Sequence, residues 1–408
     1  MKIWTLFASF LLLSVSAQAQ SDWTQWGGPN RDFVINSKGL AATWPATGPK
    51  QVWSRPLGAG HSAILASGNT LYTTYGVDEQ EVVIALAADT GKTIWEYKYA
   101  SPSAGMNYEY GIGPHSTPLL VGDLLYSVGA TGKLFALDKK TGKVAWSHDL
   151  WKEYGGTKMD RGYSCSPIAY KNTIILTLGG QGQTLIALNQ KDGTVAWKNQ
   201  SLDMSPSSPI IANVDGQDQL IMFLGKVVAG LDPNNGNLLW SHPHVTEWGL
   251  NISLPVWGPD NLLFISSAYS GGSRVLKLTQ KDGKTTAAEL WFHRRMRLHH
   301  GTAIRIGDYV YGSSGDFGPA FFAAVNVKTG EVAYQDRSFP KSNFVLADGN
   351  LIILDEDGNL ALATATPTEL KVISKVSVLK NLAWTAPTLV GTKLYLRDRR
   401  TITALDLS

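Results

Sequence analysis

The sequence predicts an all-β protein, folded as a single eight-bladed β-propeller with four-stranded blades, and three observations support this. The segment ALDKKTGKVAW at residues 136–146 returns as ALNQKDGTVAW at residues 187–197. Successive copies repeat at intervals of 51, 51, 43, 47 and 47 residues, with turn glycines at Gly91, Gly142, Gly193, Gly236, Gly283 and Gly330. Segments with a helical period are scarce beyond the N-terminal segment. A period of about 40 to 50 residues built only from strand-like segments is typical of propeller blades.

Each copy of the repeat predicts a strand, a turn and an outer strand. The D-x-x-T/D-G turn supplies an aspartate that starts the turn and a glycine that accepts positive φ. The large, flat indole that follows suits the wedge between two blades, with a backbone carbonyl as partner for its N–H. We expect this docking role for Trp53, Trp95, Trp146, Trp197, Trp240, Trp291 and Tyr334. Small residues at the first position of the copies should allow a neighbouring backbone to approach: Ala85, Ala136, Ala187, Gly230 and Ala324.

The two ends of the chain complete the count of blades. A degenerate copy without tryptophan follows Tyr334, and the last segment, from Trp384, gives three strands and stops. The missing fourth strand is supplied by GPKQVWSRPL near the N-terminus, so the last blade is closed by the N-terminal strand and no sheet edge stays open. The propeller is expected to cover residues 40–408, preceded by an N-terminal arm at residues 20–39.

Residues 1–19 have the features of a cleavable signal peptide. A lysine precedes an apolar run, and Ala17-Gln18-Ala19 forms an A-x-A cleavage site. No cysteine follows to accept a lipid, and no later run is long enough for a transmembrane segment. We therefore expect a periplasmic or secreted, monomeric protein of bacterial type.

The bulk composition limits the classes of partner. The 408 residues are 44% apolar and 17% charged with a net charge of +3, which is an ordinary globular composition without an electrostatic footprint for nucleic acid. The basic runs at residues 294–297 and 397–400 are expected to be solvated loop charges. Partners are thus predicted to be an unknown protein or a small polar ligand.

The repeats resemble those of the pyrroloquinoline-quinone (PQQ) propeller family, which includes quinone-dependent dehydrogenases and the non-enzymatic assembly factor BamB. The A-x-D-x-x-T-G-x-h-x-W copies and the arm WTQWGGPNRD carry the resemblance, which covers nearly the whole chain after residue 19. For the dehydrogenases it implies a quinone between a tryptophan and a vicinal disulfide, a calcium ion and an aspartate base. Cys165 is the only cysteine, so that disulfide cannot form and PQQ is not expected as a cofactor; no other cofactor is indicated.

Function is expected where the copies differ, in the loops that lead into the innermost strands. Corresponding positions should form a ring around the mouth of the central channel, and three of the eight places are His61, His115 and His300. Polar and aromatic loops feed this ring. The candidate ligand-binding residues are Tyr108, Glu109, His61, His115, Arg161, Trp248, His299, His300 and Trp384.

Four interpretations of these histidines stay open. His61, His115 and His300 could hold zinc or copper together with Glu109, although blade 6 lies three blades away from blade 1. They could act as a general acid and base, could hydrogen-bond water and strand ends, or could line a funnel for a ligand or partner. His299 and His300 are neighbours on a strand, so they should face opposite sides and not act as a pair.

The sequence as a whole predicts an exported binding or assembly scaffold that holds a ligand or partner on the loop face around the channel. The alternative is an enzyme with a histidine-lined site at the channel mouth, either a metal- or quinone-dependent oxidoreductase or a hydrolase or lyase. Catalytic residues are not assigned, and no metal ligand set is preferred. Cys165 is expected to be buried and inert.

Overall fold

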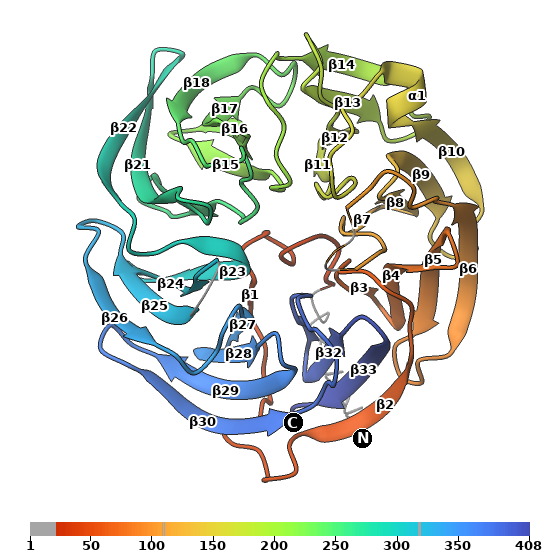
Figure 1. Ribbon diagram of the computed structural model, residues 1–408, viewed down its shortest axis with the longest axis vertical. Helices are drawn as coiled ribbons and strands as arrows, with labels where there is room; N and C mark the ends of the chain where they lie inside the picture. Colours follow the sequence, from red (N-terminus) through yellow and green to blue (C-terminus); the bar gives the residue numbers. More distant parts are fainter. Residues whose placement is uncertain (1–21, 108, 110, 317–319) are drawn as a thin grey trace, which may run out of the picture.

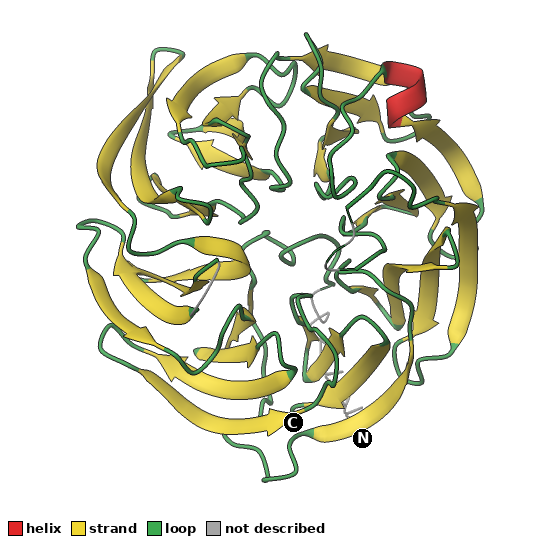
Figure 2. Ribbon diagram, in the orientation of Figure 1, coloured by secondary structure: helices red, strands yellow, loops and turns green. Residues whose placement is uncertain are grey.

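The computed structural model describes residues 22–107, 109, 111–316 and 320–408. The predicted signal peptide at residues 1–19 and the candidate Tyr108 lie outside these residues. The strands form eight antiparallel blades in a closed ring (Figure 1), which confirms the predicted fold class. Figure 2 shows that almost everything between the strands is loop; within the described residues the one helix is α1 (Leu150–Tyr154). No described helix is long and apolar enough to cross a membrane.

The first four blades follow one another along the chain. Blade 1 holds β3 (Leu65–Ser67), β4 (Thr70–Val77), β5 (Gln80–Ala87) and β6 (Thr93–Ala100). Blade 2 holds β7 (Leu119–Val121), β8 (Leu124–Val128), β9 (Lys133–Asp138) and β10 (Val144–Asp149). Blade 3 holds β11 (Ile168–Tyr170), β12 (Thr173–Thr177), β13 (Leu185–Asn189) and β14 (Val195–Asn199). Blade 4 holds β15 (Ile210–Val214), β16 (Gln217–Phe223), β17 (Val227–Leu231) and β18 (Leu238–Pro243).

The other four blades continue the ring. Blade 5 holds β19 (Val256–Trp257), β20 (Leu262–Ser267), β21 (Gly272–Lys281) and β22 (Lys284–His293). Blade 6 holds β23 (Leu298–Ile306), β24 (Tyr309–Ser314), β25 (Phe321–Asn326) and β26 (Val332–Asp336). Blade 7 holds β27 (Asn343–Ala347), β28 (Asn350–Leu354), β29 (Asn359–Ala365) and β30 (Leu370–Ser377). Blade 8 holds β31 (Thr388–Val390), β32 (Lys393–Arg397), β33 (Thr401–Asp406) and β2 (Lys50–Pro56).

The N-terminal strand closes the last blade, as predicted. β2 pairs antiparallel with β33, with Trp53 opposite Ala404, so both ends of the chain share one sheet. The first strand of each blade lies nearest the channel. We call the face on which these inner strands begin the mouth face, and the opposite face the far face.

The N-terminal arm crosses the channel rather than packing on the outside (Figure 1). The backbone of Trp23 exchanges two hydrogen bonds with Ala66, of 2.8 and 2.9 Å, at the end of β3. Farther along, β1 (Val34–Ile35) pairs parallel with β27 and gives blade 7 a fifth strand. Trp23 is 1% exposed and packs against Gly28, where an added Cβ would lie 3.2 Å from the indole. The arm is thus part of the core.

A bulge aims the docking residues toward the next blade. In every blade the pairing of the third and fourth strands shifts register near this position, as between Val144 and Trp146. Four indoles then donate to a backbone carbonyl of the following blade, Trp53 to Ala88 at 2.8 Å, Trp95 to Lys139 at 3.0 Å, Trp146 to Gln190 at 3.0 Å and Trp291 to Val327 at 2.7 Å.

Three predicted docking residues differ. The buried Nε1 of Trp197 and the buried hydroxyl of Tyr334 have no hydrogen-bond partner among the described residues, although Trp197 lies against Gly236. Trp240 donates instead to the side chain of Gln219 in its own blade, at 2.7 Å. The expected carbonyl partner is wrong for Trp240 because Gly230 leaves room for the indole to lie over its own sheet. An added Cβ at Gly230 would lie 2.1 Å from Trp240 Nε1.

The variant Gly230→Ala is therefore expected to displace Trp240, although alanine suits a strand better than glycine. We expect a loss of about 1–3 kcal/mol in the free energy of unfolding, as is usual for overpacking. Urea unfolding measures it. Gly68→Ala is a control for the added methyl group, because nothing lies within 4 Å of its Cβ position; that turn has a φ of 55°, so some strain is expected there too. A Gly230→Ala variant as stable as the parent would contradict the packing described.

The expectation of a solvated basic run at residues 397–400 is wrong for Arg397. This side chain is 0% exposed, whereas Arg400 is exposed. Its guanidinium donates to the backbone carbonyls of Ser62, Thr74 and Gly58 at 3.2, 2.7 and 3.1 Å, and so ties blade 8 to blade 1. Burial lowers its pKa to about 10, which leaves it charged at neutral pH.

Candidate functional site

The loops before the inner strands bring most of the predicted candidates to the mouth face. His61 and His115 lie just before β3 and β7, Trp384 lies before β31, and His299 and His300 lie at the start of β23. Trp248 lies in the loop between β18 and β19 and is 55% exposed.

These side chains form a continuous row of rings. The imidazoles of His61 and His115 stack with their planes 9° apart and their centres at 5.5 Å. Trp384 follows, with its ring centre 5.5 Å from that of His61 and 4.3 Å from that of His300. The row continues through His299, Tyr269 and Trp248, with ring centres 4.8, 5.1 and 4.9 Å apart in succession. We call these seven residues the mouth wall.

The Trp384 indole links side chains from blades that are far apart in the ring. His61 and His300 belong to blades 1 and 6, and the indole from blade 8 lies between them. Tyr269 was missed by the sequence analysis because it comes from the β20–β21 turn, and only the loops leading into inner strands were considered. Its hydroxyl hydrogen-bonds the Nε2 of His299.

The prediction that His299 and His300 face opposite sides is wrong. Their Nδ1 atoms lie 3.0 Å apart in a hydrogen bond. The register of β23 against β24 shifts between Leu298 and Ala303, so the intervening residues do not follow the alternation of a regular strand.

Three imidazoles of the wall, those of His115, His299 and His300, are held in the neutral form at pH 7. Burial, with the nearby cations Arg161 and Arg399, lowers the pKa of His115 to about 4. Burial and the Lys341 ammonium lower the pKa of His299 to about 4. The pKa of His300 is also lowered well below its ordinary value, mainly by burial. At neutral pH these rings offer apolar faces and uncharged hydrogen-bonding nitrogens.

Charged groups lie around the wall rather than in it. Trp384 Nε1 donates to the Glu356 carboxylate at 2.9 Å, and the Lys341 ammonium lies 5.8 Å from the indole centre and 3.9 Å from the same carboxylate. Arg161 lies 3.8 Å from Glu109, whose side chain is 61% exposed. Glu109 and Arg161 therefore lie at the rim, whereas the other predicted candidates among the described residues line the wall.

The wall does not assemble a metal site. Among the residues that the structure describes, no three histidine, cysteine, aspartate or glutamate side chains are grouped so that they could hold a metal ion. His61 and His115 stack face to face, which directs their nitrogens past each other rather than toward a common point. The proposed set with Glu109 is therefore not formed.

The residues present also do not fit the quinone that the family resemblance implies. Cys165 is buried, burial raises the pKa of its thiol, and its single occurrence excludes a vicinal disulfide. The Trp384 indole is already in contact with His61, His300 and Lys341.

A second histidine contact superficially resembles a nucleophile and its base. His244 Nε2 lies 2.7 Å from the Ser267 hydroxyl, and both residues are 1% exposed. However, Arg274 Nε donates to His244 Nδ1 at 3.0 Å, so the proton of a neutral ring sits on Nε2 and is donated to the serine. This imidazole cannot take the proton of Ser267, and the pair is structural.

The low pKa values predict an acid-sensitive fold. On folding, the pKa of each of these two histidines falls from its ordinary 6.5 to about 4. Above pH 6.5 the ring is neutral in both states and its titration does not change the stability. Between pH 6.5 and pH 4 only the unfolded state binds the proton, so the free energy of unfolding decreases as the pH falls. We expect about 3 kcal/mol of lost stability for each of His115 and His299 by pH 4. Unfolding by urea from pH 7 to pH 4 measures this. The His115→Asn variant should have a shallower pH dependence; the same curve as the parent would contradict the pKa assignment.

Comparisons with known proteins agree with the fold. The family model described as outer membrane protein assembly factor BamB matches residues 79–336. An uncharacterized protein of Rickettsia prowazekii is 23% identical over 277 residues, which is 65% of this chain and 63% of that protein. BamB of Yersinia pestis is 24% identical over 228 residues, 51% of this chain and 53% of that protein. The chain therefore spans less than two thirds of the length of these relatives.

Solved structures of two kinds share the architecture. BamB from Moraxella catarrhalis matches with a TM-score of 0.60 at 16% identity, over 87% of this chain and 97% of that one. Quinohemoprotein alcohol dehydrogenase from Comamonas testosteroni matches with a TM-score of 0.64 at 14% identity, over 95% and 80% of the two chains. These likenesses establish the propeller fold, and because the family model matches more than half of the sequence, the chain belongs to the PQQ-repeat family of β-propellers described as outer membrane protein assembly factor BamB.

Proposed function

We propose that this protein is an exported binding scaffold for the assembly of outer-membrane proteins, and that it holds its partner on the mouth face. The family match over residues 79–336 is the observation that carries the assembly role. The signal peptide predicted at residues 1–19 supports a periplasmic location, because it would direct the chain across the inner membrane.

The mouth wall is proposed as the contact surface because of its chemistry. It joins aromatic rings from five blades, and aromatic side chains that are rigid and partly exposed are typical anchors of protein interfaces. Trp248, at its outer end, is 55% exposed and contacts Tyr269, with the two ring planes tilted by 55°. Arg161, Arg297 and Lys341 lie near this wall with Glu109, Asp316 and Glu356, so a polar rim surrounds an apolar centre.

The same chemistry argues against the alternative of an acid–base enzyme. A general base works best with a pKa near the working pH, and the pKa values of His115 and His299 are about 4. The wall histidines contact one another, Tyr269 and Trp384. His115 and His299, with pKa values of about 4, are poor proton acceptors at neutral pH. Neutral imidazoles packed among aromatic rings suit the binding of a partner better than proton transfer.

The test is complementation of a deletion strain of the natural host, with the amount of correctly assembled outer-membrane protein as the measurement. The parent gene should restore assembly, and Trp248→Ala should restore it only in part. Phe292→Ala is the matched control, because Phe292 is also an exposed aromatic (40%) but lies on the outer strand β22 and is not part of the mouth wall.

Equal cellular amounts of the three proteins must be verified by immunoblot. If deletion of the gene leaves outer-membrane protein assembly unchanged, the assembly role is wrong. If Trp248→Ala restores assembly as fully as Phe292→Ala does, the role stands but the mouth face is not its contact surface.

A further inference from the structure

Three cationic side chains at the mouth face have hydrogen-bonding capacity that the protein itself does not use. Arg297 and Lys341 lie just before the inner strands β23 and β27, and Arg399 lies in the turn between β32 and β33 of blade 8. Among the residues that the structure describes, these three side chains donate no hydrogen bond. A ligand that brings acceptors would therefore find free cationic donors here.

The carboxylates nearest to Arg297 and Lys341 do not saturate them. Arg297 lies 3.6 Å from Asp316 and Lys341 lies 3.9 Å from Glu356, and both separations are longer than a hydrogen bond. The two carboxylates accept hydrogen bonds from the mouth wall instead. Asp316 accepts the backbone N–H of Tyr269 at 3.0 Å, as Glu356 accepts the indole N–H described above.

Arg399 is less compensated still. It takes part in none of the ion pairs of the described chain, and its buried Nε has no hydrogen-bond partner. The loop before β7 lies against it, since an added Cβ at Gly111 would be 1.8 Å from Arg399 Nη2. Its neighbour Asp398 accepts the backbone N–H groups of Arg400 and Thr401, both at 2.7 Å.

The charges of these cations are felt along the mouth wall. Burial lowers the pKa of His115 most, and the charges of Arg161 and Arg399 lower it further. Burial also lowers the pKa of His299 most, and Lys341 and Arg161 lower it further against the opposing charge of Asp316. Cations therefore lie close enough to act on a group bound at either histidine.

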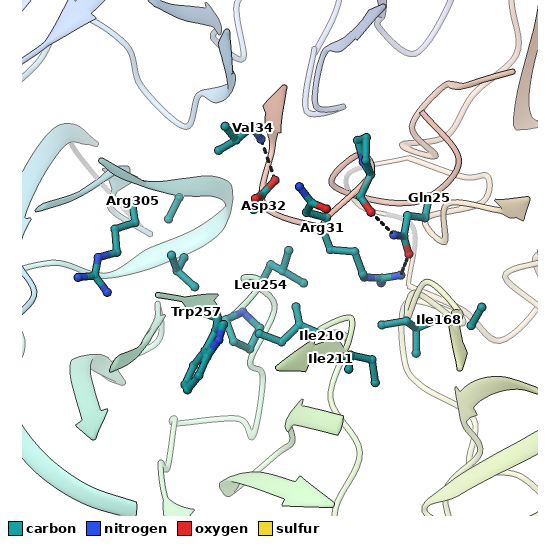
Figure 3. A pocket seen from close by; sticks show the side chains of 16 residues that line it. Gln25, Arg31, Asp32, Val34, Ile168, Ile210, Ile211, Leu254, Trp257 and Arg305 are labelled. Carbon is teal, nitrogen blue, oxygen red and sulfur yellow. Dashed lines mark hydrogen bonds between the residues drawn. The ribbon is translucent and has the colours of Figure 1, made fainter. Parts of the chain in front are cut away.

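The cations beside the arm are engaged, by contrast. A cavity of about 480 Å³ lies there, between the arm and the inner strands of blades 3 to 6 (Figure 3). Both terminal nitrogens of Arg305 bond the Asp260 carboxylate, at 2.7 and 2.8 Å. Those of Arg31 donate to two backbone carbonyls before β11, at 2.9 and 3.3 Å, and Figure 3 marks a further contact with Gln25. The mouth is thus the end with unengaged terminal donors.

The arrangement of charges favours separate carboxylates over a continuous polyanion. The cations are interleaved with the carboxylates of Glu109, Asp316 and Glu356, which would repel the closely spaced phosphates of a nucleic acid. The acidic side chains of a peptide are spaced by other residues, so each can accept charge-assisted hydrogen bonds from one cation. The exposed Trp248 indole offers a surface for an apolar side chain between them.

We propose that the mouth face binds an acidic segment of its partner protein, whose aspartate or glutamate carboxylates accept hydrogen bonds from Arg297, Lys341 and Arg399 while a neighbouring apolar side chain lies on Trp248. Complementary charges at such a rim give specificity and speed the encounter of the two proteins. This inference rests on the proposed function, because it names the chemistry of the partner held on that face.

The test is calorimetric binding of the full mature chain, at pH 7, to three blocked twelve-residue peptides. Each peptide holds three copies of X-Phe-X-Gly, in which X is glutamate, glutamine or lysine. We expect the glutamate peptide to bind at least about tenfold more tightly than the glutamine peptide, and the lysine peptide to bind most weakly. A strand of twelve thymidine nucleotides, as a continuous polyanion, should bind more weakly than the glutamate peptide.

The triple variant Arg297→Gln, Lys341→Gln, Arg399→Gln should lower the affinity for the glutamate peptide to that for the glutamine peptide. The matched control removes the same charge from exposed turns between the third and fourth strands of blades 1 to 3, on the far face, and should keep the preference. It carries Lys92→Gln, Lys140→Gln and Lys191→Gln. Thermal unfolding verifies each fold. If the triple variant does not fold, Lys341→Gln alone should weaken glutamate-peptide binding at least about threefold.

Each opposite outcome overturns the inference. Equal binding of the glutamate and glutamine peptides, or no binding of the glutamate peptide, would remove the charge selection. A preference that survives the mouth variant, or that the far-face control also loses, would mean that the mouth cations are not its source. Tighter binding of the thymidine strand would indicate a nucleic-acid site instead. Unchanged assembly after deletion of the gene would remove the assembly role but not the peptide preference, so the two failures are distinguishable.

Discussion

A chain that begins at Leu57 is expected to lose its cooperative unfolding transition and to be far less stable than a chain that begins at Ala42, because only the longer chain keeps β2. The shorter chain lacks β2, which supplies six paired residues to β33 and the Trp53 contact with the next blade. Loss of a packed tryptophan costs about 3–5 kcal/mol and each lost hydrogen bond about 1 kcal/mol, so the sum approaches the 5–15 kcal/mol of a typical domain. Without β2 the edge of β33 is also open to aggregation.

Calorimetry and size-exclusion chromatography of the two chains measure this effect. The chain from Ala42 isolates the contribution of the arm, because it lacks residues 22–41 but keeps the closing strand. It should unfold at a lower temperature than the parent, because it lacks the buried Trp23 and Phe33, and at a higher temperature than the chain from Leu57. If the two truncated chains unfold at the same temperature, closure by β2 is not what holds the ring together.

The second large effect is expected for Arg397→Met, with a loss of about 3–5 kcal/mol in the free energy of unfolding. Methionine fills most of the space but leaves the carbonyls of Ser62, Thr74 and Gly58 without a donor at the junction of blades 8 and 1. Urea unfolding at pH 7 measures the loss.

Arg400→Met is the matched control, because Arg400 belongs to the same basic run but is exposed. Its effect should stay within about 0.5 kcal/mol, as is usual for surface substitutions. An Arg397→Met variant as stable as the Arg400→Met variant would contradict the structural role of the buried guanidinium.

The fold could be predicted from the sequence because the blade repeat is local. The turn glycines and the tryptophans recur within a single hairpin, and the partner strand for the incomplete last blade could be found by elimination. The same local view failed for Trp240, whose indole lies over Gly230 on the neighbouring strand and donates to Gln219 two strands away.

The site could be predicted only in part. His61, His115 and His300 could be placed on the mouth face because they occupy corresponding positions before inner strands, and propeller symmetry makes all inner strands begin on one face. It could not show that Trp384 joins blades 1 and 6, that a register shift turns His299 toward His300, or that Tyr269 enters from another loop. These contacts are non-local and depend on packing.

The arm is the other feature that the sequence left open. The resemblance of WTQWGGPNRD predicted an arm at residues 20–39, but not a path through the channel. Within the channel, the backbone of the arm pairs with blades 7, 1 and 2, and the Arg31 side chain reaches the carbonyls of Ser166 and Pro167 at the start of blade 3.

The central claim is that the mouth wall binds a partner and does not host a metal or quinone centre. The most direct test is elemental analysis with an absorption spectrum, on protein purified from its own host without chelator, beside the His61→Ala, His115→Ala, His300→Ala triple variant. We predict no stoichiometric metal and no quinone absorbance in either protein. Stoichiometric metal or quinone absorbance in the parent that disappears in the triple variant would contradict the claim and make the mouth wall a reaction centre.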